Sequence, residues 1–297
     1  MFRRMAASFI LATVWSSVTG ALEPGKAQSQ SEPKESQPFI EDVAPEDVKK
    51  FLDPTLLING LSYSFTSNFL PQDSRLYTHQ FEPMWAVNHW TAFWARVPIN
   101  ELSIPGEETP TDVGDILTGW GAVIHENLGR RFTSSVGWFE VLAPTGRVEK
   151  GTGLGTWVLA PGGGIALNPT NQFPIYITGR YLHSLGNIGG DDDGSDTDEK
   201  RNLRVRSIEL NIETIHIFPK GFYVAALPSF VFNLNQNFNF FSLGVGVGRA
   251  LNRNFAIAGG YVHHVAGRQT FSQGFTVGLN FVWGDPKVKK AALGAKK

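Results

Sequence analysis

The 297-residue sequence predicts an all-β fold, a transmembrane antiparallel β-barrel of about 12 strands. Three observations indicate this fold: an N-terminal export signal, apolar residues that alternate with polar ones over about ten to fourteen positions, and connections that alternate between short and long. A tilted strand needs about nine to eleven residues to cross a bilayer, whereas strands of soluble proteins centre on five or six. Because soluble sandwiches also alternate, strand length and loop pattern carry the prediction.

The composition excludes several classes of protein. With 26 basic and 27 acidic residues the net charge is -1, and nucleic acid is not expected as a partner because phosphate binding requires a basic excess. The absence of cysteine excludes disulfides, a thiolate nucleophile, a cysteine-ligated zinc and a lipidated cysteine. The 32 Gly, 22 Phe and 8 Trp residues favour a β-rich chain with many turns and large apolar faces.

Residues 1–21 have the three parts of a secretory signal peptide. Arg3 and Arg4 precede an apolar stretch over 5–15, and small residues follow up to Ala21. The apolar stretch is too short to cross a bilayer as a helix, so cleavage after Gly20 or Ala21 is expected. Its removal takes away two Arg and no acid, which moves the net charge to about -3.

Residues 22–57 form a predicted leader before the barrel. The part over 22–37 is rich in Ser, Gln, Lys, Glu and Pro and is expected to be flexible, because it cannot bury enough apolar area to offset the entropy of ordering. Pro45 and the acids after it, with apolar residues three to four apart, predict a short helix over 44–52. This helix could plug the barrel, but a solvated periplasmic segment is the favoured interpretation.

The barrel is predicted over 58–284, followed by a charged tail over 285–297. Short connections near 88–89, 126–130, 169–171, 219–220 and 252 alternate with mostly longer ones, which places both termini in the periplasm of an outer membrane. An even strand count agrees with this topology. The predicted strands are 59–70, 78–88, 90–99, 113–125, 131–143, 155–168, 172–185, 204–217, 221–232, 238–249, 253–264 and 272–283.

Aromatic residues are placed where a membrane barrel needs them. On the last strand Phe275, Val277, Leu279, Phe281 and Trp283 alternate with small or polar residues, which predicts a lipid-facing stripe. Several tryptophans near strand ends are expected in girdles at the headgroup level. These are Trp85, Trp90, Trp94, Trp120, Trp138, Trp157 and Trp283.

A set of short motifs resembles the family labelled MetA-pathway of phenol degradation. The motifs are VGDIL at 113–117, FEVLAPTG at 139–146, GLGTWVLAPG at 153–162, IELN at 208–211, PKGFY at 219–223 and LGVGVGR at 243–249, and the match spans about 58–284. Each motif is short, but their order and spacing together are specific. The resemblance implies an outer-membrane channel or transporter, associated by name with the catabolism of aromatic compounds, and it supplies no catalytic residues.

The parity of the strands predicts which side chains face the lumen. If the large apolar residues face lipid, polar residues of the other parity face inward, in a pore that twelve strands make narrow or partly plugged. The favoured interpretation is that the charges pair across the barrel; alternatively they line a solute path, with acids favouring cations. The lumen-lining candidates are Glu82, Arg96, Asp115, Glu140, Arg180, Glu209, Asn211, Glu213 and Asn280.

A channel for small solutes, including hydrophobic or aromatic ones, is the leading functional prediction. The alternatives are a structural or adhesive surface barrel and, with less support, a lipid-modifying enzyme with a Ser or Asp beside a His on the lipid-facing rim. Neither a catalytic set nor a cofactor nor a metal is predicted, and the acidic run over 191–199 is typical of a solvated loop rather than a calcium site. The expected partners are outer-membrane lipid and lipopolysaccharide, the barrel-assembly machinery and a small solute.

Overall fold

The computed structural model describes residues 42–106, 109–126, 132–187, 204–235, 238–268 and 271–283. The predicted signal peptide over 1–21, the leader over 22–41, the acidic run over 191–199 and the tail over 285–297 lie outside the described residues.

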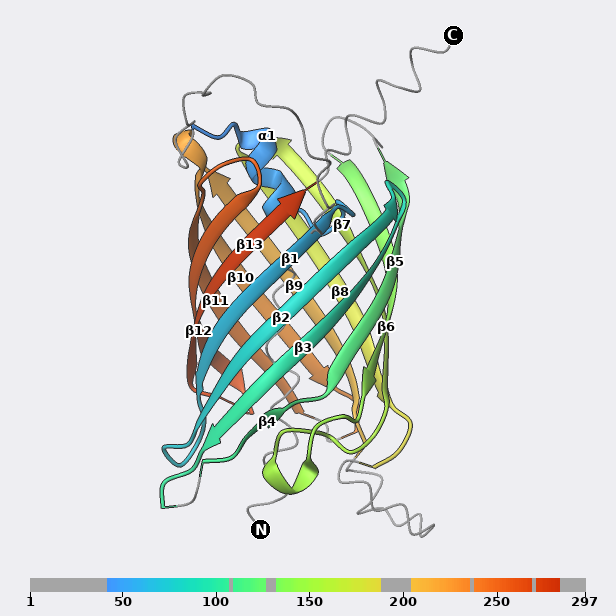
Figure 1. Cartoon of the computed structure of the whole chain (residues 1–297), viewed down its shortest axis with the longest axis vertical. Helices are drawn as coiled ribbons and strands as arrows, with labels where there is room; N and C mark the ends of the chain where they lie inside the picture. The colour runs from blue at the N-terminus through green and yellow to red at the C-terminus, as the bar shows by residue number, and fades with distance from the viewer. Residues whose placement is uncertain are drawn as a thin grey trace, which may run out of the picture.

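The described residues form one closed antiparallel β-barrel, which confirms the predicted fold class (Figure 1). Each long strand pairs with its neighbours in the sequence, and β1 pairs with β13 from Asn59 opposite Trp283 to Phe69 opposite Gln273, so the sheet has no free edge. The strands are β1 (Asn59–Phe69), β2 (Arg75–Asn88), β3 (Thr91–Ser103), β4 (Thr111–Val113), β5 (Ile116–Glu126), β6 (Phe132–Ala143), β7 (Val158–Thr170), β8 (Phe173–Ser184), β9 (Arg206–Ile217), β10 (Phe222–Asn233), β11 (Phe238–Ala250), β12 (Phe255–Gly267) and β13 (Gln273–Trp283). The three-residue β4 adds only a short pairing to β3, so twelve long strands form the wall.

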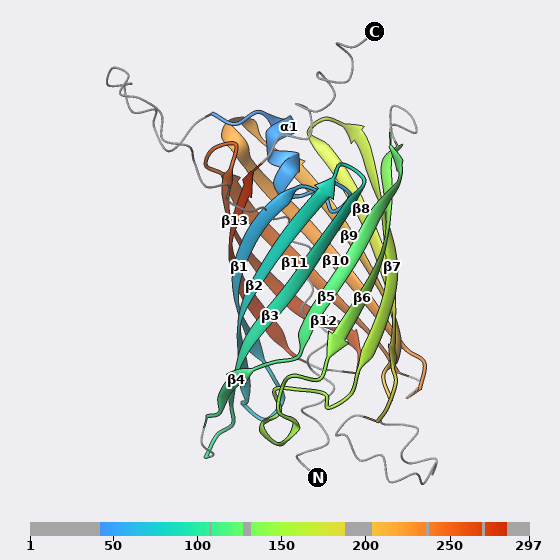
Figure 2. The same cartoon turned by 45° about the vertical axis from the view of Figure 1, so that its right-hand side comes forward.

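The connections at the two ends of the barrel differ in length. The end where β1 begins and β13 ends carries the tight turns β2–β3 and β7–β8 and the turn from β9 to β10 through η5 (Pro219–Gly221). The opposite end carries β4 and the long β6–β7 connection with its short helix η4 (Val148–Lys150), as Figure 2 shows. In the orientation predicted from the loop lengths, the tight turns are periplasmic and the long connections extracellular; we use these two names for the ends below.

The outer surface of the barrel is apolar, because large side chains alternate outward along each strand. Nearly all strands contribute, and the exposed fraction of these side chains is 52% at Val277 and 57% at Val247. A soluble protein would not leave so continuous a belt in water, whereas a bilayer covers it. Members of the belt include Leu61, Phe81, Trp85, Phe93, Trp120, Phe139, Ile208, Val224, Val245, Phe275 and Leu279.

Two of the tryptophans predicted for the aromatic girdle lie inside the barrel instead. Trp85, Trp120 and Trp157 are about half exposed, as a girdle requires, but Trp94 is buried at 9% exposure and Trp138 is partly buried against the same cluster. Trp94 lies two residues from Arg96 and therefore on the same, inward face of β3. Tryptophan content alone does not reveal this, because a barrel uses aromatic side chains both outside and inside.

Glycines on the neighbouring strands make room for these inward rings. Trp94 lies opposite Gly119 of β5, and Trp138 lies opposite Gly162 of β7. A Cβ atom on Gly119 would overlap the indole of Trp94, and one on Gly162 would overlap the indole of Trp138. Each ring therefore lies over a glycine of the neighbouring strand, at a position without a side chain. The ring fills this part of the lumen and the wall does not have to widen.

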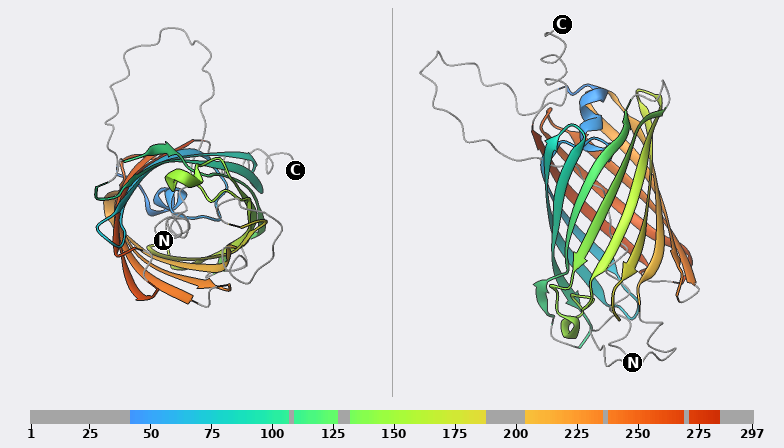
Figure 3. Two further views of the ribbon diagram at one scale, coloured as in Figure 1. Left: turned by 90° about the horizontal axis from the view of Figure 1, so that it is seen from below. Right: turned by 90° about the vertical axis from the view of Figure 1, so that its right-hand side faces the viewer.

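The segment before the barrel is not solvated, in contrast to the favoured interpretation of the sequence. It forms α1 (Pro45–Val48) and η3 (Lys49–Phe51), which lie within the periplasmic mouth (Figures 1 and 3). Val48 and Phe51 are almost completely buried in a cluster with inward residues of β7 to β13. The segment fits because the wall carries small residues where it docks. These residues are Ala166, Ala225, Ala250, Ala256 and Ala258. No helix of the described residues is long and apolar enough to cross a membrane.

The glycine opposite Trp94 gives a test of this packing. Gly119→Val should lower the free energy of unfolding by about 1 to 3 kcal/mol, because the new side chain must displace a buried indole. The matched control is Gly278→Val on β13, where an added Cβ meets only ordinary contacts. The measurement is urea unfolding of the detergent-purified barrel, followed by its heat-modifiable gel shift; equal stability of both variants would contradict the packing described here.

Candidate functional site: the barrel lumen

The nine predicted lumen residues are spread over the wall, and the structure brings five of them together. The inward faces of β2, β3, β6, β8 and β9 contribute Glu82, Arg96, Glu140, Arg180 and Glu209, all at most 8% exposed. Asn211 and Glu213 continue along the same face of β9 toward the periplasmic end. Asp115 and Asn280 lie elsewhere and are described below.

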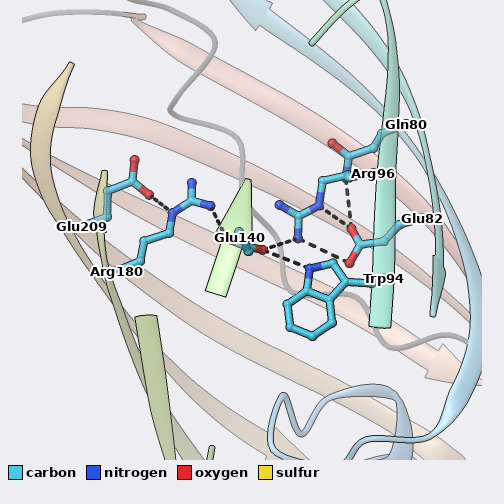
Figure 4. Close-up of polar contacts among 7 residues, drawn as sticks. All are labelled: Gln80, Glu82, Trp94, Arg96, Glu140, Arg180 and Glu209. Carbon is cyan, nitrogen blue, oxygen red and sulfur yellow. Dashed lines mark hydrogen bonds and ion pairs between the residues drawn. The ribbon is translucent and has the colours of Figure 1, made fainter. Parts of the chain in front are cut away.

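These five side chains form one continuous ion-pair network, shown in Figure 4. Arg96 donates to Glu82 through Nε at 2.6 Å, and its Nη2 lies 3.7 Å from Oε1 of Glu140. Arg180 bonds to Glu140 at 3.0 Å and to Glu209 at 2.7 Å. The indole nitrogen of Trp94 donates a further hydrogen bond to Glu140 at 3.1 Å. The opposite charges therefore pair inside the barrel, and Glu140 joins the two halves of the network.

The folded barrel depends on the network staying complete, because a buried charge without its partner is costly. Removing one member leaves its partners as uncompensated charges in a region with little water. Three carboxylates face two guanidinium groups, so the five residues carry a formal charge of -1. Together with Trp94 and Trp138 they occupy much of the lumen along the inward faces of β2, β3, β6, β8 and β9, with cavities beside them.

Asp115 holds a loop at the extracellular end. It lies just before β5, and its two oxygens accept hydrogen bonds from the backbone N–H groups of Gly146, at 2.9 Å, and Leu154, at 2.7 Å. It thereby ties the β6–β7 connection to the start of β5, although it also lies on the wall of a cavity at this end. Asn280, on β13, is buried at 8% exposure, and its Oδ1 has no hydrogen-bond partner within the described ranges.

Inward residues of β8 to β13, β1 and β2 enclose a chamber beside this network, which we call the lumen chamber. Hydroxyl and amide groups form much of its wall, and apolar residues, among them Leu227, Val231, Phe240 and Val262, form the rest together with two acids. Pro54 of the N-terminal segment borders it. The uncharged polar residues of the wall are Ser64, Thr66, Thr78, Gln80, Tyr176, Thr178, Asn211, Ser229, Ser242, Tyr261 and Thr276.

The lumen chamber has two acidic side chains on its wall and no Lys, Arg or His of the described residues. These are Glu209, which is paired with Arg180, and Glu213, which takes no part in the ion-pair network. Two further cavities share wall residues with it: Thr78 and Gln80 on the extracellular side, and Pro54, Thr178 and Asn211 beside the ion-pair network. Within the described ranges no three His, Asp or Glu side chains are close enough to hold a metal ion.

The sequence analysis missed the hydroxyl groups, although the signal for them was present. Thr78 has the same inward parity as Glu82 on β2, and Thr276 has that of Asn280 on β13. Thr66 lies opposite Thr276 across the β1–β13 seam, with their hydroxyl oxygens 3.0 Å apart. Because only charged and Asn side chains were selected, the uncharged majority of the wall was left out. The docked N-terminal segment was missed for a different reason, since its partners are spread over seven strands.

Asp53 is a buried acid at the junction of the N-terminal segment and the wall. Its Oδ1 accepts hydrogen bonds from the backbone N–H of Thr55 at 2.9 Å and from the hydroxyl of Thr55 at 2.6 Å. The hydroxyl of Thr55 also contacts that of Ser134 on β6, which fastens the segment to the wall. Burial raises the pKa of Asp53 to about 6, while the bonds from Thr55 and the charge of Lys49 oppose this rise.

Comparison with known proteins supports the fold. No protein-family model and no curated protein sequence matches the chain. The structure is similar to that of an outer membrane channel from Pseudomonas putida F1, with a TM-score of 0.57 and 10% identity over 76% of this chain and 94% of that one. It is also similar to the NanC porin, with a TM-score of 0.54 and 10% identity over 75% of this chain and 100% of that one. The chain therefore has the fold of an outer-membrane β-barrel.

Breaking the ion-pair network should destabilise the barrel. Arg180→Met leaves Glu209 without its guanidinium partner and weakens the pairing of Glu140, so we expect a loss of about 3 to 5 kcal/mol in the free energy of unfolding. The control is Arg147→Met, whose pair with Asp112 is 59% exposed on the Arg side and should cost less than about 1 kcal/mol. Urea unfolding in detergent micelles measures both, and equal losses would show that the buried network does not stabilise the wall.

Docking of the N-terminal segment should weaken as the pH rises. The pKa of Asp53 is about 6 in the docked state and near 3.8 when the segment is free, so the docked state binds more protons between these values. The part of the docking free energy that depends on Asp53 is therefore greatest at low pH and decreases as the pH rises toward 6. Above pH 6 the docking free energy no longer changes with the ionisation of Asp53. Between pH 5 and 8 the docking constant should fall roughly tenfold.

Tryptic cleavage after Lys50 measures this effect, because the buried segment must leave the mouth to be cut. The ratio of the cleavage rates of the native chain and of Asp53→Asn at each pH cancels the pH dependence of trypsin. We expect the ratio to rise roughly tenfold from pH 5 to pH 8. A ratio that is constant over this range would contradict the role of Asp53.

Proposed function

We propose that the protein is an outer-membrane channel for small solutes, with the lumen chamber as part of the solute path. The observation that carries this proposal is the contrast between the two faces of one closed wall: an apolar belt outside and a chamber lined by hydroxyl, amide and carboxylate groups inside. A barrel that served only as a surface anchor would not need such a polar chamber. The solved channel and porin with this fold agree with the proposal.

The charge of the chamber favours cations over anions. Glu213 and the ion-pair network, which includes Glu209 and carries a formal charge of -1, give the chamber and its surroundings a net negative charge. In a narrow space of low dielectric such carboxylates attract cations and repel anions. The resemblance to the family labelled MetA-pathway of phenol degradation would add aromatic compounds to the solutes, and the apolar part of the wall supports a solute with an apolar body.

The N-terminal segment is a natural candidate for the periplasmic gate of this channel. It occupies the periplasmic mouth, and Asp47 of the segment forms a weak pair, at 3.6 Å, with Arg253 of the β11–β12 turn. A solute that leaves through this mouth requires the segment to shift. The segment can move without opening the wall, because the wall strands pair with one another and not with the segment.

One contact in the structure bears on the alternative of a lipid-modifying enzyme. Ser135 of β6 and His125 of β5 lie beside each other in exposed positions, with Oγ 3.4 Å from Nδ1. Such a long contact is a weak hydrogen bond and does not make serine a strong nucleophile. A phospholipase assay separates this alternative from a channel, and we expect no difference between the native chain and Ser135→Ala.

Single-channel conductance of the mature chain in planar bilayers tests the channel function. In a KCl gradient the native chain should conduct with a preference for K⁺ over Cl⁻, and Glu213→Gln should reduce this preference because it removes one of the two chamber carboxylates. A chain without residues 42–55 should show a higher conductance, since the mouth is no longer occupied. Glu149→Gln, which changes an exposed acid in η4, is the control for a general charge effect. Absence of conductance in both the native and the shortened chain would overturn the proposal.

A further inference from the structure

One carboxylate oxygen in the lumen chamber lacks a partner. Glu209 is only 3% exposed, and its Oε2 accepts the bond from Nε of Arg180 at 2.7 Å. Its Oε1 has no hydrogen-bond partner among the described residues, although Glu209 lines the chamber. In Figure 4 the second oxygen of Glu209 is turned away from Arg180. A buried acceptor without a donor is costly, so this oxygen is suited to a ligand that supplies a donor.

Further acceptors follow along the inward face of the two paired strands β8 and β9, toward the periplasmic end. In the register of the sheet Arg180 lies opposite Glu209, Thr178 opposite Asn211, and Tyr176 opposite Glu213. The hydroxyl of Tyr176 is buried and also has no hydrogen-bond partner in the described part of the chain. The wall thus offers two carboxylates and two hydroxyl groups along one strip, with no basic side chain of the described residues on the chamber wall.

The chamber also has an apolar wall beside this strip. Leu227 and Val231 of β10, Phe240 of β11 and Val262 of β12 point inward, and β10 is the strand paired to β9. The apolar patch therefore borders the acceptor strip. A ligand that satisfies both parts of the wall has a positively charged donor group at one end and a hydrocarbon body at the other.

We propose that the lumen chamber binds small organic ammonium compounds, with the ammonium group at Glu213 beside Tyr176 and the hydrocarbon body against the apolar residues of β10 to β12. An ammonium group supplies three donors and a positive charge, which match the carboxylate of Glu213, free of the guanidinium groups of the ion-pair network, and the unpartnered hydroxyl of Tyr176 opposite it. Oε1 of Glu209 is a second acceptor for such a group, farther along the same strip. A neutral alcohol of the same shape supplies one donor and no charge. A carboxylate of the same shape would face two acids and no base. This inference rests on the proposed function, because it names the class of solute for the same chamber.

The test compares three probes of one shape: benzylammonium, benzyl alcohol and benzoate. Calorimetry with the mature full-length chain in nanodiscs, at pH 7.5 and with empty nanodiscs as the blank, measures binding without requiring conductance. Benzylammonium should bind at least tenfold more tightly than benzyl alcohol, and benzoate should not bind. In a second series from methylammonium to pentylammonium, the affinity should rise roughly fourfold for each added methylene until the apolar wall is covered.

Two variants place the binding in the chamber. Glu213→Gln should weaken benzylammonium binding about tenfold or more, and because Glu213 takes no part in the ion-pair network, this variant is expected to fold. Glu149→Gln changes an exposed acid in η4 that does not line the chamber, and it should leave the affinity unchanged. The gel shift of the folded barrel verifies that both variants are assembled.

The outcomes separate this inference from the channel function. Binding of benzylammonium that depends on Glu213, with or without conductance, supports the inference; if conductance is absent, only the channel function fails. Conductance with equal binding of benzylammonium and benzyl alcohol overturns the inference and leaves the channel function standing. Binding that rises with alkyl length but is the same in Glu213→Gln also overturns it, because partition into lipid would then explain the result.

Discussion

The rest of the structure depends on one constraint: every backbone N–H and C=O group that crosses a bilayer needs a partner within the protein. Twelve long strands meet this constraint by closing on one another, with β1 paired to β13 over eleven positions. In a closed wall one face contacts only lipid and the other contacts only the lumen. Side chains of one parity must then suit lipid, and side chains of the other parity must suit a narrow space with little water.

The narrow interior explains why its two halves differ. In one part, the inward rings of Trp94 and Trp138 lie over glycines beside a network of five charges from β2, β3, β6, β8 and β9. Buried charges are tolerated there because each carboxylate of the network is bonded to a guanidinium group. In the other part, many of the inward residues are Ser, Thr or Gly, and the lumen chamber remains. The same wall thus provides a rigid half and a half that can hold a solute.

The N-terminal segment fits the barrel because the wall leaves space for it. Five alanines at the periplasmic ends of four strands form a recess, and Val48, Phe51 and Leu52 fill it with apolar surface. Burying three such side chains stabilises docking by several kcal/mol, about 1.5 to 3 kcal/mol for each. Asp53 opposes this gain when it is ionised, because burial disfavours the charged form of its carboxyl group. The segment is therefore held by apolar packing and is sensitive to a single carboxyl group.

The sequence by itself determined the barrel, its twelve strands and the parity of their faces, because alternation is a local property that each strand carries in its own residues. The apolar stripe of Phe275, Val277 and Leu279 and the inward position of Glu82, Arg96, Glu140 and Arg180 could be read this way. Only the tertiary structure decided which inward charges meet, that Trp94 and Trp138 lie inside, and that the segment around Phe51 enters the mouth. These contacts join strands far apart in the sequence, and they depend on strand stagger and on the space left by Gly119, Gly162 and the alanines, which no single segment encodes.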